Sequence, residues 1–152
     1  MTTKSFNLGT AISEVIENLA MMVVQELDEN PDGFNPQLMG TIEFTGPVNG
    51  KLVVRCSDSF SSVLAGNLLG IDPADQHIQA NAWDALEELL NVVCGNLVNV
   101  LFDRNKTFRL SSPRIDLIQP LGTNDIDELD QIVYLRLDDE IVEFSLVTKN
   151  PG

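Results

Sequence analysis

Hydrophobic residues recur at helical spacing in two long segments of the chain. The first covers residues 10–27, where apolar side chains return every three or four positions and predict an amphipathic helix. The second and longest covers residues 80–102. A shorter helix is expected over residues 59–69, with Gly70 as its C-terminal cap. The apolar positions of the first segment are Ile12, Val15, Ile16, Leu19, Met22, Val23 and Leu27.

Other segments alternate apolar and polar residues, which is typical of strands with one buried face. Residues 41–45 and 51–56 flank a turn rich in glycine and predict a β-hairpin. Residues 108–110 and 114–118 are expected to be short strands on either side of Pro113. The hairpin thus lies between the two long helical segments, and the two short strands follow the second of them.

A second hairpin closes the chain, with strands at residues 132–137 and 142–147 and a turn at 138–140. Each half of the sequence thus reads as a long helix followed by an antiparallel hairpin. We therefore predict an α+β fold, an antiparallel sheet with two long helices packed on one face and pseudo-duplicated helix–hairpin units. No linker or low-complexity tract divides the chain, so residues 1–152 are expected to form a single domain.

The net charge of the chain limits the classes of partner that it is expected to bind. With 9 Lys and Arg against 23 Asp and Glu, the formal net charge is −14. Such a balance argues against binding nucleic acid or an anionic membrane, and it suits a partner with an exposed cation. No apolar run approaches a membrane span or a signal sequence, and Cys56 and Cys94 lack the spacing of secreted proteins. We therefore expect a cytoplasmic protein with reduced thiols.

Metal and nucleophile chemistry finds little support in the sequence. The single histidine, His77, rules out a multi-histidine zinc site, and its position in a polar loop does not favour a Ser-His-Asp triad. An acidic loop at residues 124–130 lacks the glycine and the distal glutamate of an EF-hand. A solvated loop is favoured there over a calcium site, so no metal ligand is assigned in this chain. The acidic residues considered for calcium are Asp125, Asp127, Glu128 and Asp130.

The longest helix has two distinct faces. At about 100° per residue, Asp84, Glu88, Asn91 and Gly95 fall within about 40° of one line, with the spacing i, i+4, i+7, i+11. The opposite face is apolar and is expected to pack in the core. Its residues are Leu86, Leu89, Leu90, Val93, Leu97 and Val100.

The polar line has two interpretations. Any amphipathic helix has a solvated polar face, and for Asp84 that explanation is at least as good as a functional one. Glu88 is less easily explained in this way, because it shares the line with Asn91 and Gly95. Asn91 and Gly95 are less expected there, because asparagine is a mediocre helix former and an interior glycine costs about 1 kcal/mol relative to alanine. An amide at a fixed position beside a residue without bulk also suits a docking surface for a partner that carries a cation.

The spacing Asp84-x3-Glu88-x2-Asn91, followed by Pro113, resembles the signature of the CheC/CheX/FliY family of chemotaxis phosphatases. The segments Gly40–Gly46, Gly50–Val54 and Val63–Gly70 are similar to the hairpin and short helix of its CheX-like members. The resemblance extends over nearly the whole chain.

This resemblance implies hydrolysis of the aspartyl phosphate on a CheY-like response regulator receiver domain. Asn91 would orient the attacking water, and Glu88 would pair with a receiver lysine. Asp84, Gly95 and Pro113 would contribute to binding the partner. The chain would need no cofactor of its own, because the receiver supplies Mg²⁺. An acyl phosphate is already activated, so positioning a water molecule is the main chemical requirement.

The resemblance also implies a homodimer joined at sheet edges, for which the terminal hairpin offers apolar positions at Val133, Leu135, Val142, Phe144 and Leu146. Packing of these five in one core is the simpler interpretation. A non-catalytic adaptor that binds a receiver or a flagellar switch protein stays as an alternative. In the first helix, Ser13 and Glu17 match the start of the motif but Ala20 replaces the amide, so one site per chain is expected.

Overall fold

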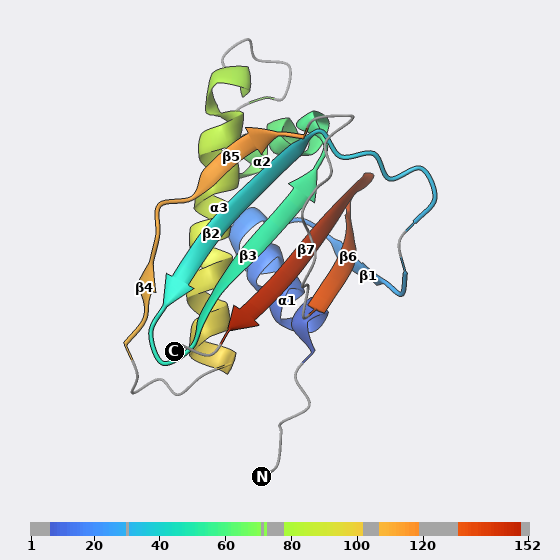
Figure 1. Ribbon diagram of the computed structural model, residues 1–152. Coiled ribbons are helices and arrows are strands. Elements are labelled where there is room, and N and C mark those ends of the chain that lie inside the picture. Colours follow the sequence, from blue (N-terminus) through green and yellow to red (C-terminus); the bar gives the residue numbers. More distant parts are fainter. Residues whose placement is uncertain are drawn as a thin grey trace.

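The computed structural model describes residues 7–29, 31–70, 72, 78–101, 107–118 and 131–149. These residues form one antiparallel sheet of seven strands, with three helices on one of its faces (Figure 1). In chain order the elements are α1 (Leu8–Ala20), β1 (Val24–Leu27), β2 (Leu38–Thr45), β3 (Asn49–Cys56), α2 (Asp58–Leu69), α3 (Ile78–Leu101), β4 (Arg109–Leu110), β5 (Arg114–Leu117), β6 (Gln131–Leu137) and β7 (Glu140–Lys149).

The strand order of the sheet is β1-β6-β7-β3-β2-β4, and β5 also pairs with β2. The hairpins β2–β3 and β6–β7 meet at the centre of the sheet through the β3–β7 pairing. Each hairpin follows one of the two long helices, α1 or α3. The predicted α+β architecture of helices on one face of an antiparallel sheet is therefore confirmed.

The short helix and the hairpins lie where the sequence predicts them. Helix α2 begins after Ser57, whose hydroxyl accepts a hydrogen bond from the backbone N–H of Phe60 at 2.9 Å. It ends at Gly70, whose φ of 68° is left-handed, as the predicted glycine cap requires. His77 and the acidic loop at residues 124–130 lie outside the described residues. No helix in the described part is long and apolar enough to cross a membrane.

The helix expected over residues 10–27 is wrong for residues 21–27. Helix α1 ends at Ala20, and Met21 takes a left-handed backbone conformation with φ of 53°. The chain then continues as β1, which pairs with β6. Met22 is 3% exposed, Val23 is 78% exposed and Val24 packs against the core, an alternation that fits a strand. Apolar spacing alone did not distinguish this strand from a last helical turn, and the hydrogen bonds offered by β6 decide the outcome.

The terminal hairpin is not an edge of the sheet, so the expectation that it offers dimer edges is wrong. Strand β7 lies between β3 and β6, and β6 lies between β7 and β1. The outer positions among the described strands belong to β1 and to the β4–β5 side of β2. Of the five apolar positions named for the dimer contact, Val133 is partly buried and packs against the core, and the other four are buried: Leu135, Val142, Phe144 and Leu146.

Helix α3 lies close over β2 because Gly40 has no side chain. A Cβ atom at Gly40 would lie 2.7 Å from Leu90 Cδ1 and 2.9 Å from Ile115 Cδ1. Leu90 of α3 and Ile115 of β5 thus fill the space above the bare backbone of β2. This contact fixes the middle of α3 over the β2–β5 side of the sheet.

Candidate functional site

The buried face of α3 anchors the helix to the sheet. Five of the six residues predicted for this face are almost fully buried: Leu86, Leu89, Leu90, Val93 and Leu97. Val100, the sixth, is 58% exposed, whereas Cys94 and Val98 are buried. The buried stripe therefore shifts around the helix in the last turns of α3, away from Val100 and toward Cys94 and Val98. The periodicity of the helix alone does not contain that shift.

The opposite face presents the four residues that the periodicity places on one line. Asp84, Glu88 and Asn91 are exposed and Gly95 is partly exposed. We call these four residues the acid–amide line. Among the described residues, none forms a hydrogen bond or an ion pair with the side chains of Asp84, Glu88 or Asn91. Their carboxylates and amide are thus held by a rigid, packed helix and are available to a partner.

Gly95 is not required by the fold. A Cβ atom at this position would find no heavy atom within 4 Å, so a side chain has room there. The backbone of Gly95 is helical, and alanine is favoured over glycine by about 1 kcal/mol in a helix interior. A glycine that costs stability and relieves no clash suggests that the missing bulk serves a close approach by another molecule.

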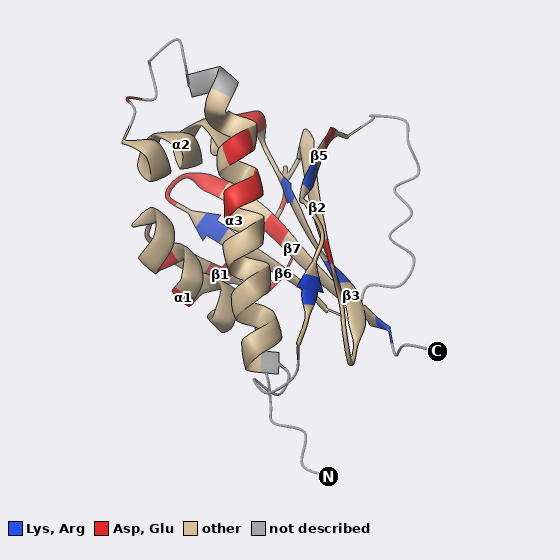
Figure 2. Ribbon diagram, turned by 90° about the vertical axis from the view of Figure 1, so that its left-hand side faces the viewer, with Lys and Arg blue, Asp and Glu red and all other residues tan. Residues whose placement is uncertain are grey.

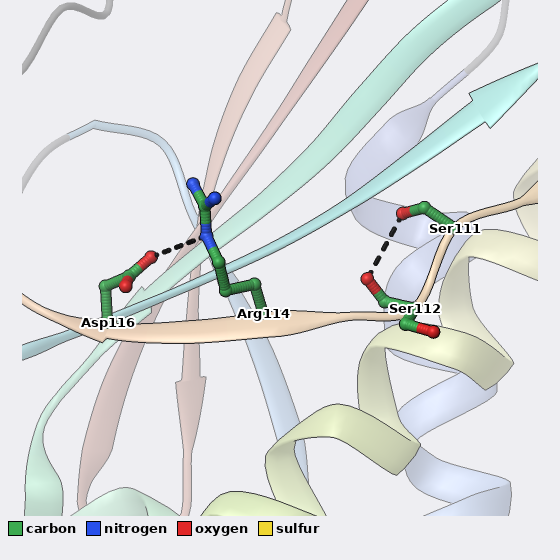
Figure 3. A network of polar contacts seen from close by, with 4 residues as sticks. All are labelled: Ser111, Ser112, Arg114 and Asp116. Atoms are coloured by element: carbon green, nitrogen blue, oxygen red, sulfur yellow. Dashed lines mark hydrogen bonds and ion pairs between the residues drawn. The ribbon is translucent and has the colours of Figure 1, made fainter.

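Serine side chains support the strand edge beside α3. The hydroxyl of Ser111 accepts a hydrogen bond from the Glu43 backbone N–H at 2.9 Å, and the Ser111 N–H donates to Glu43 O at 2.8 Å. The same hydroxyl donates to the Ser112 carbonyl at 3.3 Å (Figure 3). Arg114 and Asp116, further along the edge, form an exposed ion pair at 3.0 Å. Such exposed pairs contribute little stability, so this segment is held to β2 by the contacts of Ser111 with Glu43 and by the backbone pairing of β4 and β5 with β2.

Pro113 lies on this edge, between β4 and β5, and is partly buried. A proline has no backbone N–H to donate to β2, so it suits an interruption between two short strands. Ile115, two residues later, meets Leu90 above Gly40, and Leu90 directly precedes Asn91. The structure therefore places Pro113 on the edge beside the part of α3 that carries Asn91.

Among the described residues, the sheet carries charges of both signs, whereas the helices carry only acidic ones. Every Lys and Arg among the described residues lies on a strand, and none lies on α1, α2 or α3 (Figure 2). The helices carry only acidic charges, and three of these belong to α3. A cation on a partner therefore meets no repulsion from the helices. The six acidic residues of the helices are Glu14, Glu17, Asp58, Asp84, Glu87 and Glu88.

Helix α1 does not repeat the acid–amide line. Glu17 is exposed, but Ser13 is 7% exposed and Ala20 is 1% exposed. Ala20 is also the last residue of α1, so the position that corresponds to Asn91 points into the core at the end of the helix. The number of sites per chain therefore stays a prediction, and α1 shows no second exposed amide at the corresponding position.

One buried polar group was not anticipated from the sequence. Arg55 and Glu143 pair across β3 and β7 with Nη1 and Oε1 2.5 Å apart, and they are 5% and 8% exposed. Burial, followed by a hydrogen bond to Glu143, raises the pKa of Tyr134 to about 12. Alternation along β3 turns Arg55 away from the helices, because Val54 and Cys56 are in the core. This group therefore belongs to the other face of the sheet and does not contribute to the acid–amide line.

The described residues contain no group of three or more His, Cys, Asp or Glu that could hold a metal ion. The acid–amide line itself offers carboxylates, an amide and a close approach to the helix backbone at Gly95. Such groups bind a cation and orient a small polar molecule such as water.

Comparison with known proteins places this chain in a family. The sequence profile of the family described as Chemotaxis phosphatase CheX matches residues 38–134, which include the whole of α3 and Pro113. Among curated proteins, none has a significantly similar sequence.

Several solved structures share the fold. CheX of Borrelia burgdorferi, in a complex with CheY, BeF3 and Mg²⁺, is 17% identical with a TM-score of 0.71, covering 93% of this chain and 95% of that one. CheX of Desulfovibrio desulfuricans is 16% identical with a TM-score of 0.71, covering 93% and 96%. FliY of Thermotoga maritima is 16% identical with a TM-score of 0.56, covering 92% and 82%. The family match over residues 38–134 and the shared fold lead to one conclusion: the chain belongs to the CheX family of chemotaxis phosphatases.

Proposed function

We propose that this chain hydrolyses the aspartyl phosphate of a CheY-like receiver domain. The observation that carries the proposal is the acid–amide line, exposed and without a partner among the described residues, on helices that carry only acidic charge. Membership of the CheX family and the complex of the Borrelia relative with CheY support a receiver as the partner.

Asn91 is the proposed catalytic residue. Its side-chain amide enters the phosphorylation site of the receiver and holds a water molecule in line with the bond between phosphorus and the aspartyl oxygen. The water oxygen bonds to phosphorus as the phosphorus–aspartyl bond breaks. The bonding electrons leave with the aspartyl carboxylate, and the water protons remain with phosphate and solvent. Mg²⁺ held by the receiver supplies charge neutralisation at the phosphoryl group.

The other residues of the site position the partner. Glu88 lies one turn before Asn91 and forms an ion pair with a receiver lysine, which sets the register of the two proteins. Asp84 extends the same polar contact by one turn. Gly95 lets receiver loops approach the helix backbone, and Pro113 adds a contact at the strand edge. This division assigns turnover to Asn91 and affinity mainly to Glu88.

Phosphate release from a phosphorylated, Mg²⁺-loaded receiver tests the proposal directly. The protein should accelerate release, and Glu88→Gln should raise KM. Binding of the receiver without any acceleration would contradict the enzyme assignment. That result would favour the adaptor alternative, in which the same surface binds a receiver or a switch protein.

We further propose that the protein acts in the cytoplasm as a homodimer joined at free sheet edges. Because β6 and β7 are internal, the edges left for such a contact among the described strands are β1 and the β4–β5 side. Sedimentation at micromolar concentration tests whether the dimer forms. A protein that stays monomeric over this concentration range would contradict the proposed dimer.

A further inference from the structure

A hollow between α1 and α3 lies directly beside the acid–amide line. Its volume is about 350 Å³. Val92 and Asn96, which form the α3 side, each immediately follow a residue of the line, Asn91 and Gly95. A partner seated on Asn91 therefore reaches the hollow as well. The six residues that line it are Glu14, Val15, Asn18, Leu19, Val92 and Asn96.

The lining has two chemical parts. Val15, Leu19 and Val92 are apolar and partly buried, and Glu14 and Asn18 are exposed polar residues on the α1 side. The exposed Asn96 on the α3 side donates a hydrogen bond to Val92 O within its own helix at 2.8 Å, so its amide is held close to α3. An apolar surface between polar side chains suits an amphipathic element with an apolar side chain at its centre.

Charge indicates what flanks that side chain. The hollow carries one formal charge, the carboxylate of Glu14, and neither of the two helices that line it, α1 and α3, contains a Lys or Arg. An element with basic residues beside its apolar side chain is attracted here, whereas an acidic element is repelled by every charge on the helical face.

We infer that this hollow receives an amphipathic, basic element of the same receiver domain that engages Asn91, and that it determines which receiver the protein recognises. The inference rests on the proposed function. It adds a second contact, separate from the reacting groups, at which receivers with different surface residues are discriminated. We expect the contact in the hollow to be equally strong in the ground state and in the transition state, because it lies apart from the reacting groups. Such a contact changes KM and leaves kcat unchanged.

Two charge reversals on α1 form a matched test. Glu14 lines the hollow, whereas Glu17, one turn later and also exposed, does not. In phosphate-release assays with the cognate phosphorylated receiver, Glu14→Lys should raise KM about fivefold or more and leave kcat within twofold. Glu17→Lys causes the same change in net charge and should leave both constants within twofold. Equal effects of the two substitutions would overturn the inference.

A direct probe of the hollow does not depend on turnover. Asn96→Cys places a thiol at the hollow, and Glu17→Cys places one outside it. Both native cysteines are buried with their pKa raised to about 12, so an environment-sensitive dye labels the introduced thiol selectively near pH 7.5. Addition of the Mg²⁺-loaded, BeF3-treated receiver should shift the emission of the dye at position 96 and leave that at position 17 unchanged.

The two proposals fail in different ways. If the wild-type protein hydrolyses the phosphoryl group but neither Glu14→Lys nor the dye at position 96 responds, only the recognition role of the hollow is wrong. If no receiver is bound or dephosphorylated by the wild-type protein, the proposed function is wrong and this inference is overturned with it.

Discussion

Leu90 of α3 and Ile115 of β5 meet above the bare backbone of Gly40. The Cδ1 atoms of both side chains lie within 3 Å of the point where a Gly40 side chain would begin. Asn91 is the residue after Leu90, so this contact fixes the height and rotation of the proposed catalytic amide over the sheet. The same contact joins α3 to the strand edge that carries Pro113. Precise placement of a water-positioning group depends on rigid support of this kind.

Gly40→Ala tests that contact. The added methyl group would lie 2.7 Å from Leu90 Cδ1 and 2.9 Å from Ile115 Cδ1, so the core must shift to accept it. Overpacking of this type costs about 1–3 kcal/mol of unfolding free energy, measurable by urea denaturation. Phosphatase activity should fall in parallel because α3 moves with Leu90. An unchanged urea midpoint would show that α3 is not seated on β2 as described.

Gly95→Ala makes the same chemical change where the space is open. We expect the free energy of unfolding to rise by about 0.5–1 kcal/mol, because alanine is the better helix former and no atom lies within 4 Å. The same methyl group should lower kcat/KM toward a phosphorylated receiver by obstructing its approach to the helix backbone. A variant that is more stable and fully active would contradict the docking role of Gly95.

Removing one member of the buried Arg55–Glu143 pair should be costly. Both side chains are nearly inaccessible, so Arg55→Met leaves the buried Glu143 carboxylate without its cation. The expected loss of unfolding free energy is about 3–5 kcal/mol. The double variant Arg55→Met, Glu143→Met should recover a large part of that loss, since neither charge is then buried. Losses that simply add in the double variant would show that the two side chains do not interact.

The two native thiols should not react in the folded protein. Burial raises the pKa of both Cys56 and Cys94 to about 12, so at pH 8 both are protonated and inaccessible. A thiol-reactive chromogen at pH 8 should therefore detect no fast-reacting thiol in the native state and two after addition of urea. Fast reaction of Cys94 in the native protein would mean that the C-terminal half of α3 is not packed against the core as described.

The sequence predicted the features that depend on local periodicity. The faces of α3, the Gly70 cap and both hairpins follow from the spacing of apolar residues and from turn chemistry, which do not require knowledge of the tertiary contacts. The features that it did not predict depend on those contacts. Met21 ends α1 because β6 offers a pairing partner to the next residues, and the exposure of Val100 depends on how the last turns of α3 lie on the rest of the fold.

The candidate site shows the same division. The acid–amide line could be read from the periodicity of one helix, because all four residues belong to α3. The hollow could not be predicted from the sequence, because Glu14 and Asn96 come from two helices whose relative placement is set by packing on the sheet. The buried pair of Arg55 and Glu143 was not predicted from the sequence either, because charged residues are usually exposed.

The most direct measurement compares wild type with Asn91→Ala for both receiver affinity and turnover. Trp83, the single tryptophan of the chain and one residue before Asp84, is 38% exposed and can report binding of a tryptophan-free receiver. We predict that Asn91→Ala binds the phosphorylated, Mg²⁺-loaded receiver with nearly wild-type affinity but releases phosphate about 100-fold more slowly, because the amide acts in the transition state. Release at the wild-type rate would contradict the assignment of Asn91 as the residue that positions the attacking water.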